Sequence, residues 1–187
     1  MYIFLLIVIA TFILSIFSTN WPFKLSHHLF LKKLATEWGV QPVKHGLFLS
    51  GVYSELSVEC FNKPIIIRFL EGSADALYAN SGLEIRIRAI NWDGIAECYR
   101  INRRKQEWGE FKRVFSGEPE IDRTWLILSP ETQKTEGLFK RDGSKKILGL
   151  REVNQLLFNK NEAVIQLRQV YTVRRLKAIA ETLAANL

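Results

Sequence analysis

Cysteine and histidine are both scarce in this sequence of 187 residues. The two cysteines, Cys60 and Cys98, have neither a CxxC partner nor a histidine at ligand spacing. Two cysteines are too few for a disulfide framework, so we expect two reduced thiols, with a single bridge as the alternative. Adjacent His27 and His28 would project about 100° apart on a helix, which makes them a poor pair of metal ligands.

The common sequence signatures of catalysis are absent as well. The chain contains no HExxH motif, no GxSxG elbow, no GxxxxGK[ST] loop and no GxGxxG fingerprint. These patterns mark zinc proteases, serine hydrolases, NTPases and dinucleotide-binding enzymes. We therefore predict a non-enzymatic protein, with no catalytic residues, no bound metal and no cofactor.

Charge is missing from the N-terminus, because no Lys, Arg, Asp or Glu precedes Lys24. The uncharged run Tyr2–Thr19 also lacks Pro and Gly. As a helix it would rise about 27 Å, close to the ~30 Å hydrocarbon core of a bilayer. We predict a transmembrane anchor over residues 1–20. A cleaved signal peptide would need a basic n-region and a site like AxA, and a buried core helix is the other alternative.

The formal net charge of +7 lies wholly in residues 24–187. Lys24, Lys32 and Lys33 follow the apolar run closely. The positive-inside rule then predicts a single-pass protein of the inner membrane, with its N-terminus outside and its domain in the cytoplasm.

Residues 21–44 predict a juxtamembrane amphipathic helix and a linker. The helix is expected over 25–38, with Ser26 as its N-cap and Gly39 at its end. Its apolar face would pack on the domain core or, alternatively, lie on the bilayer surface.

Residues 45–187 predict one α+β domain with an antiparallel sheet and packed helices. We expect a hairpin that turns at Ser54-Glu55, an alternating half-exposed strand over 83–90 and a buried strand over 124–129. Ser129-Pro130 would start a helix. Asn159-Lys160-Asn161 would connect a second hairpin, and residues 172–187 would form a terminal helix capped by Thr172.

Basic residues of the domain are the candidate binding site. Arg86 and Arg88 share one face of the strand 83–90, while Arg100, Arg103 and Arg104 follow in a charge-dense stretch. Such a face could be merely solvated, or it could contact anionic lipid headgroups, which an anchor would favour. Nucleic acid is not expected as a partner, because no RNP-type motif is present. A protein partner is expected but is not specified by the sequence.

The segment GEPEIDRTW, residues 117–125, is the second candidate. Its carboxylates Glu118, Glu120 and Asp122 could bind a hard cation or act in acid–base chemistry. We instead predict a structural turn that leads into a buried strand. Gly117 and Pro119 would shape this turn, and Trp125 would enter the core. Asp122 would accept backbone N–H bonds, and Arg123 would pair with a carboxylate.

Two segments resemble a group of uncharacterised bacterial membrane-anchored α+β proteins. Residues 46–53 match a G-x-x-L-x-G-x-Y strand, and residues 117–125 resemble a G-D-P-E-F-D-R-R-F motif. Glu118, Ile121 and the absence of a second arginine depart from that pattern. The resemblance implies an α+β domain near a bacterial membrane and implies no activity.

The sequence thus predicts a membrane-anchored binding or scaffold module. The alternatives are an enzyme with an unfamiliar site at residues 118–122 and a membrane-tethered nucleic-acid binder.

Overall fold

The computed structural model describes residues 2–18, 21–41, 43–45, 53–70, 82–101, 109–168, 170 and 172–187. The chain divides into two compact units, Met1–Leu56 and Ser57–Leu187. The boundary therefore falls within a strand, whereas the sequence predicts a domain that starts at residue 45.

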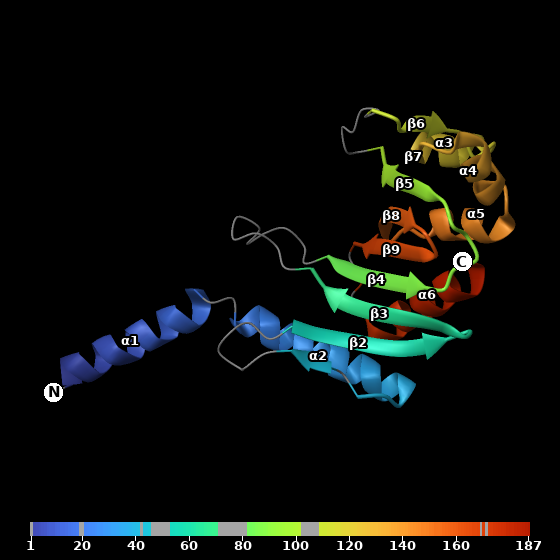
Figure 1. Cartoon of the computed structure of the whole chain (residues 1–187). Coiled ribbons are helices and arrows are strands. Elements are labelled where there is room, and N and C mark those ends of the chain that lie inside the picture. The colour runs from blue at the N-terminus through green and yellow to red at the C-terminus, as the bar shows by residue number, and fades with distance from the viewer. Residues whose placement is uncertain are drawn as a thin grey trace. The chain divides into compact units, whose positions relative to one another are not determined.

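The first unit begins with two helices, α1 (Tyr2–Ser18) and α2 (Trp21–Trp38) (Figure 1). No helix in the described parts of the chain combines the length and apolar character needed to cross a membrane. α2 starts before the predicted residue 25, because Pro22 fits the first turn of a helix, where its missing N–H is not needed. Ser26 is therefore inside α2 and is not its N-cap.

The end and the buried side of α2 follow the sequence more closely. Gly39 ends the helix in the left-handed conformation, with φ 66°, as predicted. Leu31, Leu34 and Ala35 are buried, but Leu29 is 56% exposed. The buried stripe is thus narrower than the predicted apolar face.

Strand β1 (Val43–His45) pairs antiparallel with the start of β2 (Tyr53–Cys60). β2 runs straight through Ser54-Glu55, so the predicted hairpin turn at these residues is wrong. The chain turns instead at Phe61-Asn62, where φ is 53° and 59°. Two successive positive φ angles match the twist of a two-residue hairpin, but a phenylalanine rarely marks such a position in a sequence.

The second unit combines an antiparallel sheet with helices, which confirms the predicted α+β class. From the C-terminal half of β2, the strand order is β2-β3-β4-β9-β8-β5-β7-β6. The strands after β2 are β3 (Lys63–Phe69), β4 (Leu83–Arg88), β5 (Ile95–Arg100), β6 (Lys112–Val114), β7 (Trp125–Ser129), β8 (Val153–Asn159) and β9 (Glu162–Leu167). The helices are α3 (Pro119–Thr124), α4 (Thr132–Phe139), α5 (Asp142–Gly149) and α6 (Val173–Asn186).

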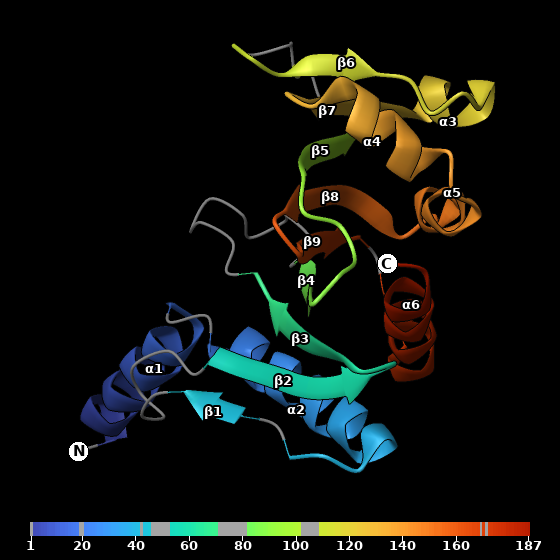
Figure 2. The same cartoon turned by 45° about the vertical axis from the view of Figure 1, so that its right-hand side comes forward.

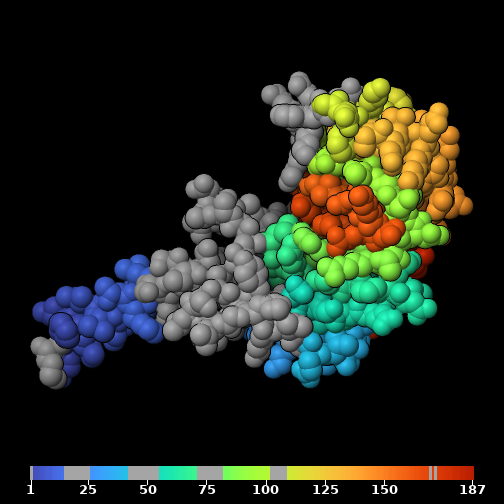
Figure 3. Space-filling view, viewed as in Figure 1, coloured from blue at the N-terminus to red at the C-terminus, as the bar shows by residue number. Residues whose placement is uncertain are grey.

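One face of this sheet forms the core. In register across β3, β4 and β9, Ile67 pairs with Ile85 and Ile85 with Ile165, and all three side chains are fully buried. Helices α3 to α6 lie on one side of the sheet in both ribbon views (Figure 2). Outward-facing side chains of β8 and β9 are open to view on the other side (Figure 3, orange-red). An antiparallel sheet with one solvated face explains the alternation seen in the sequence.

Several predicted elements are shifted in the structure. β4 ends at Arg88, since Ala89 has a positive φ of 57°. Ser129 belongs to β7, and α4 begins only at Thr132. The Ser129 hydroxyl still accepts from the Glu131 N–H at 3.0 Å. It therefore stabilises the short connection between β7 and α4 and does not cap the helix.

The C-terminal elements agree with the sequence. The 159–161 hairpin forms with positive φ at Lys160 and Asn161. The Thr172 side chain accepts from the Arg175 N–H at 3.2 Å, which confirms it as the cap of α6.

Candidate functional site

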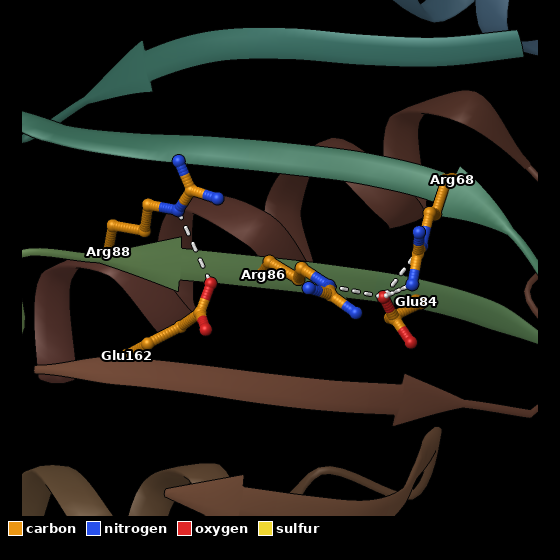
Figure 4. A network of polar contacts seen from close by, with 5 residues as sticks. All are labelled: Arg68, Glu84, Arg86, Arg88 and Glu162. Atoms are coloured by element: carbon orange, nitrogen blue, oxygen red, sulfur yellow. Dashed lines mark hydrogen bonds and ion pairs between the residues drawn. The ribbon is translucent and has the colours of Figure 1, made fainter. Parts of the chain in front are cut away.

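The predicted basic face of β4 is a network of ion pairs (Figure 4). Arg86 Nε lies 2.6 Å from Glu84 Oε1, and Arg68 Nη2 on β3 lies 2.7 Å from the same oxygen. The Glu84 side chain is only 6% exposed, so one nearly buried carboxylate is shared by two partly exposed guanidinium groups. The register brings them together, because Arg68 is the cross-strand partner of Glu84.

The second predicted arginine of β4 is paired as well. Arg88 Nε lies 3.3 Å from Glu162 Oε1 on β9, again across a register pair. The alternation that places Arg86 and Arg88 on one face of β4 also places Glu84 there. Strand pairing adds Glu162 of β9 to the same face. Most of the positive charge of this face is neutralised locally, and a lipid-binding role for these two residues stays a prediction. Arg103 and Arg104 lie outside the described residues.

Arg100, at the end of β5, has a structural role. Its Nε donates to the Val153 carbonyl at 2.7 Å, and its Nη2 donates to the Leu150 carbonyl at 2.8 Å. The guanidinium carbon lies 5.0 Å from the centroid of the Trp125 ring, within cation–π range. Burial and then the nearby Arg168 lower the pKa of Arg100. Arg100 thus fixes the α5–β8 connection.

The acidic segment forms a short helix, α3, where the sequence predicts a turn. Gly117 has a φ of 82°, and Pro119 occupies the first turn of the helix. Asp122 Oδ1 accepts from the Ser116 N–H at 2.7 Å and from Ser116 Oγ at 2.8 Å. The prediction that Asp122 accepts a backbone N–H bond is confirmed, and this contact closes the loop between β6 and α3.

Within the described residues, the other charged side chains of the segment do not share a binding partner. Glu118 Oε1 lies 2.6 Å from Lys145 Nζ on α5, and this hydrogen bond raises the pKa of Lys145. Glu120 and Arg123 are exposed, and the described residues provide no ion pair for Arg123. Within the same ranges no group of three or more His, Cys, Asp or Glu side chains could hold a metal ion.

The apolar end of the segment is anchored in the core. Trp125 is 1% exposed, and its indole N–H donates to the Leu148 carbonyl at 2.9 Å. Leu148 belongs to α5, so the tryptophan ties the start of β7 to that helix.

Both cysteines are free thiols, as expected. Cys98 is fully buried, and burial raises its pKa well above the usual value. Burial also raises the pKa of Cys60, with a further contribution from Glu181. A raised pKa leaves less thiolate at neutral pH, so neither residue has the properties of an activated nucleophile.

A group of arginines around Glu152 was missed by the sequence analysis. They come from the end of β5, the α5–β8 connection, the end of β9 and the first turn of α6. These residues are Arg100, Arg151, Arg168, Arg174 and Arg175, called the Glu152 arginine cluster below. The adjacent Arg174-Arg175 at the start of a helix was the available signal, because helix N-termini disfavour cations.

Comparisons with known proteins add a fold but no family. No protein-family model matches the sequence, and the search of curated proteins finds no match. A solved structure with a similar fold is the crystal structure of the mycobacterial trehalose monomycolate transport factor A, TtfA. The TM-score is 0.61, the alignment covers 85% of this chain and 92% of that chain, and the sequence identity is 7%. At this identity the similarity concerns the fold alone.

Proposed function

We propose that this protein is a non-enzymatic binding or scaffold module that α1 holds at a lipid bilayer. The supporting observation is the exposure of α1. Every described side chain from Tyr2 to Leu14 is exposed, and the large apolar ones are 45–79% exposed (Figure 3, blue). A helix that is apolar on all sides is normally covered by protein or lipid. Lipid is the occupant we propose.

The chemistry of α1 suits this environment. Each Leu, Ile, Val or Phe contributes about −0.3 to −0.6 kcal/mol to insertion near the bilayer centre. The polar hydroxyl of Thr11 donates to carbonyls of its own helix, at 2.7 Å to Ile7 and 3.0 Å to Val8. This internal bonding lowers the cost of placing a hydroxyl in hydrocarbon. The lysines that follow favour an orientation with residues 24–187 on the cytoplasmic side.

The contacts of the predicted site residues favour a binding role over the two alternatives. Asp122 and Glu118 of the acidic segment make structural contacts, which gives the enzyme alternative no support. Arg86 and Arg88 are ion-paired, which weakens the nucleic-acid alternative. TtfA, whose fold is similar, is named as a transport factor.

Vesicle flotation of the full chain tests the anchor. We expect the wild-type protein to float with neutral phosphatidylcholine vesicles at high salt. A charge at the centre of an inserted helix costs about 2.5–3.5 kcal/mol, so Ile7→Asp should weaken partitioning by roughly 100-fold. The matched control is Gln133→Asp, on the exposed side of α4. If the wild-type protein stays at the bottom of the gradient, the anchor proposal is wrong.

Protease treatment tests the orientation separately. A protease added outside intact cells should leave residues 24–187 intact and digest them only after lysis. Digestion in intact cells would place the domain on the other side of the membrane.

A further inference from the structure

The Glu152 arginine cluster is held together by contacts at one end of the sheet. Arg175 Nε and Nη2 donate to the two carboxylate oxygens of Glu152 at 2.7 and 3.0 Å. The Arg168 N–H donates to the Glu152 carbonyl at 2.7 Å. Arg151 is the residue before Glu152, and Arg100 binds the Leu150 carbonyl just ahead of it. Segments far apart in the sequence thus meet at Glu152, and each of them carries at least one arginine.

The charge of this cluster is not balanced. The segments that meet at Glu152 carry five arginines and this one carboxylate, which is a formal surplus of four positive charges among these six residues. The one carboxylate is held on both oxygens by Arg175, and this contact lowers the pKa of Glu152. Arg151, Arg168 and Arg174 are exposed, and their guanidinium groups make no hydrogen bond or ion pair with the residues that the structure describes.

Two features of the cluster favour an external anion. Arg174 and Arg175 occupy the first turn of α6, which contains no acidic residue. A cation at this end opposes the helix dipole, where an anion would be favoured by about 0.3–1 kcal/mol. Arg168 contributes, after burial, to the lowered pKa of Arg100, which shows that like charges lie near one another. An external anion near Arg168 or at the start of α6 would therefore meet a favourable field.

We propose that Arg151, Arg168 and Arg174 form a docking surface for the phosphate groups of anionic lipid headgroups. This inference rests on the proposed function, because α1 would keep the domain next to a bilayer. Basic residues held near a membrane surface are attracted to its anionic lipids by about 1 kcal/mol each. The planar guanidinium group suits phosphate, since it can donate two parallel hydrogen bonds.

Titration of the full chain with two kinds of vesicle tests the docking surface. One kind contains phosphatidylcholine alone, and the other contains phosphatidylcholine mixed with phosphatidylglycerol. Each basic residue near an anionic leaflet contributes about 1 kcal/mol, so the wild-type protein should prefer the anionic vesicles by roughly 100-fold. High salt should abolish this preference, because it screens exposed charges.

Two triple variants carry the same change in charge. Arg151→Glu with Arg168→Glu and Arg174→Glu should lose the preference for anionic vesicles. Lys112→Glu with Lys140→Glu and Arg141→Glu, at exposed positions outside the cluster, should keep most of it. A second cluster variant with glutamine at the three positions should lose most of the preference without adding negative charge. Thermal unfolding checks that each variant is folded.

The outcomes distinguish a failure of the docking surface from a failure of the α1 anchor. If α1 does not bind lipid, wild-type binding to neutral vesicles is lost but salt-sensitive, cluster-dependent binding to anionic vesicles persists. If the docking surface is wrong, the wild-type protein binds both vesicles equally, or the two triple variants behave alike. Cluster-dependent retention of single-stranded RNA without any preference for anionic vesicles would also overturn the proposal.

Discussion

Asp122→Ala should destabilise the protein although Asp122 is only partly buried and belongs to the short helix α3. Asp122 Oδ1 is the acceptor for both the N–H and the hydroxyl of Ser116, at 2.7 and 2.8 Å. Ser116 itself is 1% exposed, so water cannot easily replace the lost acceptor. The substitution would leave a buried backbone N–H without a partner.

The size of the effect follows from the two donors. The Ser116 hydroxyl keeps contacts with Glu118, donating to its carbonyl at 3.4 Å and accepting from its N–H at 3.1 Å. The backbone N–H has no such substitute, and an orphaned buried donor costs about 1–3 kcal/mol. We expect a loss of about 2 kcal/mol in the free energy of unfolding. For a protein of this length that corresponds to a fall in Tm of ~4–8 °C.

Urea denaturation of the full chain in a mild detergent, followed by tryptophan fluorescence, measures this loss. Glu120→Ala is the matched control, because it removes an exposed carboxylate from the same helix. Asp122→Asn keeps the Oδ1 acceptor and should lose less stability than Asp122→Ala. If Asp122→Ala and Glu120→Ala unfold at the same urea concentration, the contact with Ser116 does not stabilise the fold and the reasoning is refuted.

Two further predictions concern the region around Glu152. Arg100→Lys should lower the free energy of unfolding by about 2–3 kcal/mol, since lysine lacks the planar fork that binds two carbonyls and covers the Trp125 ring; wild-type stability in urea would contradict this role. The hydrogen bonds from Arg175 hold the pKa of Glu152 below its usual value. Its ionised form therefore adds stability above the unfolded pKa of about 4.3, and this is lost as the pH falls through the lower folded pKa. Urea midpoints of Glu152→Gln should accordingly vary less with pH in this acidic range than those of the wild type, and parallel curves would contradict the prediction.

Local patterns in the sequence predicted much of the second unit. The alternation from Leu83 to Arg88, the hairpin at Asn159–Asn161 and the Thr172 cap depend on neighbouring residues, and each forms as expected. The turn at Phe61-Asn62 was missed because its left-handed backbone is imposed by strand pairing, while Phe61 gives no local signal for it.

The contacts of the predicted binding residues depend on segments that are distant in the sequence. Sequence alternation correctly placed Arg86 and Arg88 on one face of β4. It could not show that Arg68 would lie opposite Glu84 and that Glu162 would lie opposite Arg88. Arg100 was predicted on a solvent-facing surface. Its partners are carbonyls some fifty residues later in the chain, which no local pattern reveals.

The segment 117–125 and the Glu152 arginine cluster are parts of one arrangement. Trp125 begins β7 under the guanidinium group of Arg100, and its indole N–H holds the end of α5 through Leu148. Arg100 in turn binds the carbonyls of Leu150 and Val153, the residues that flank Arg151 and Glu152. The start of β7 therefore helps to fix the connection that carries Arg151 and Glu152. A substitution that loosens Trp125 should displace the α5–β8 connection, which carries Arg151. The packing of this segment and the proposed lipid contact are therefore linked.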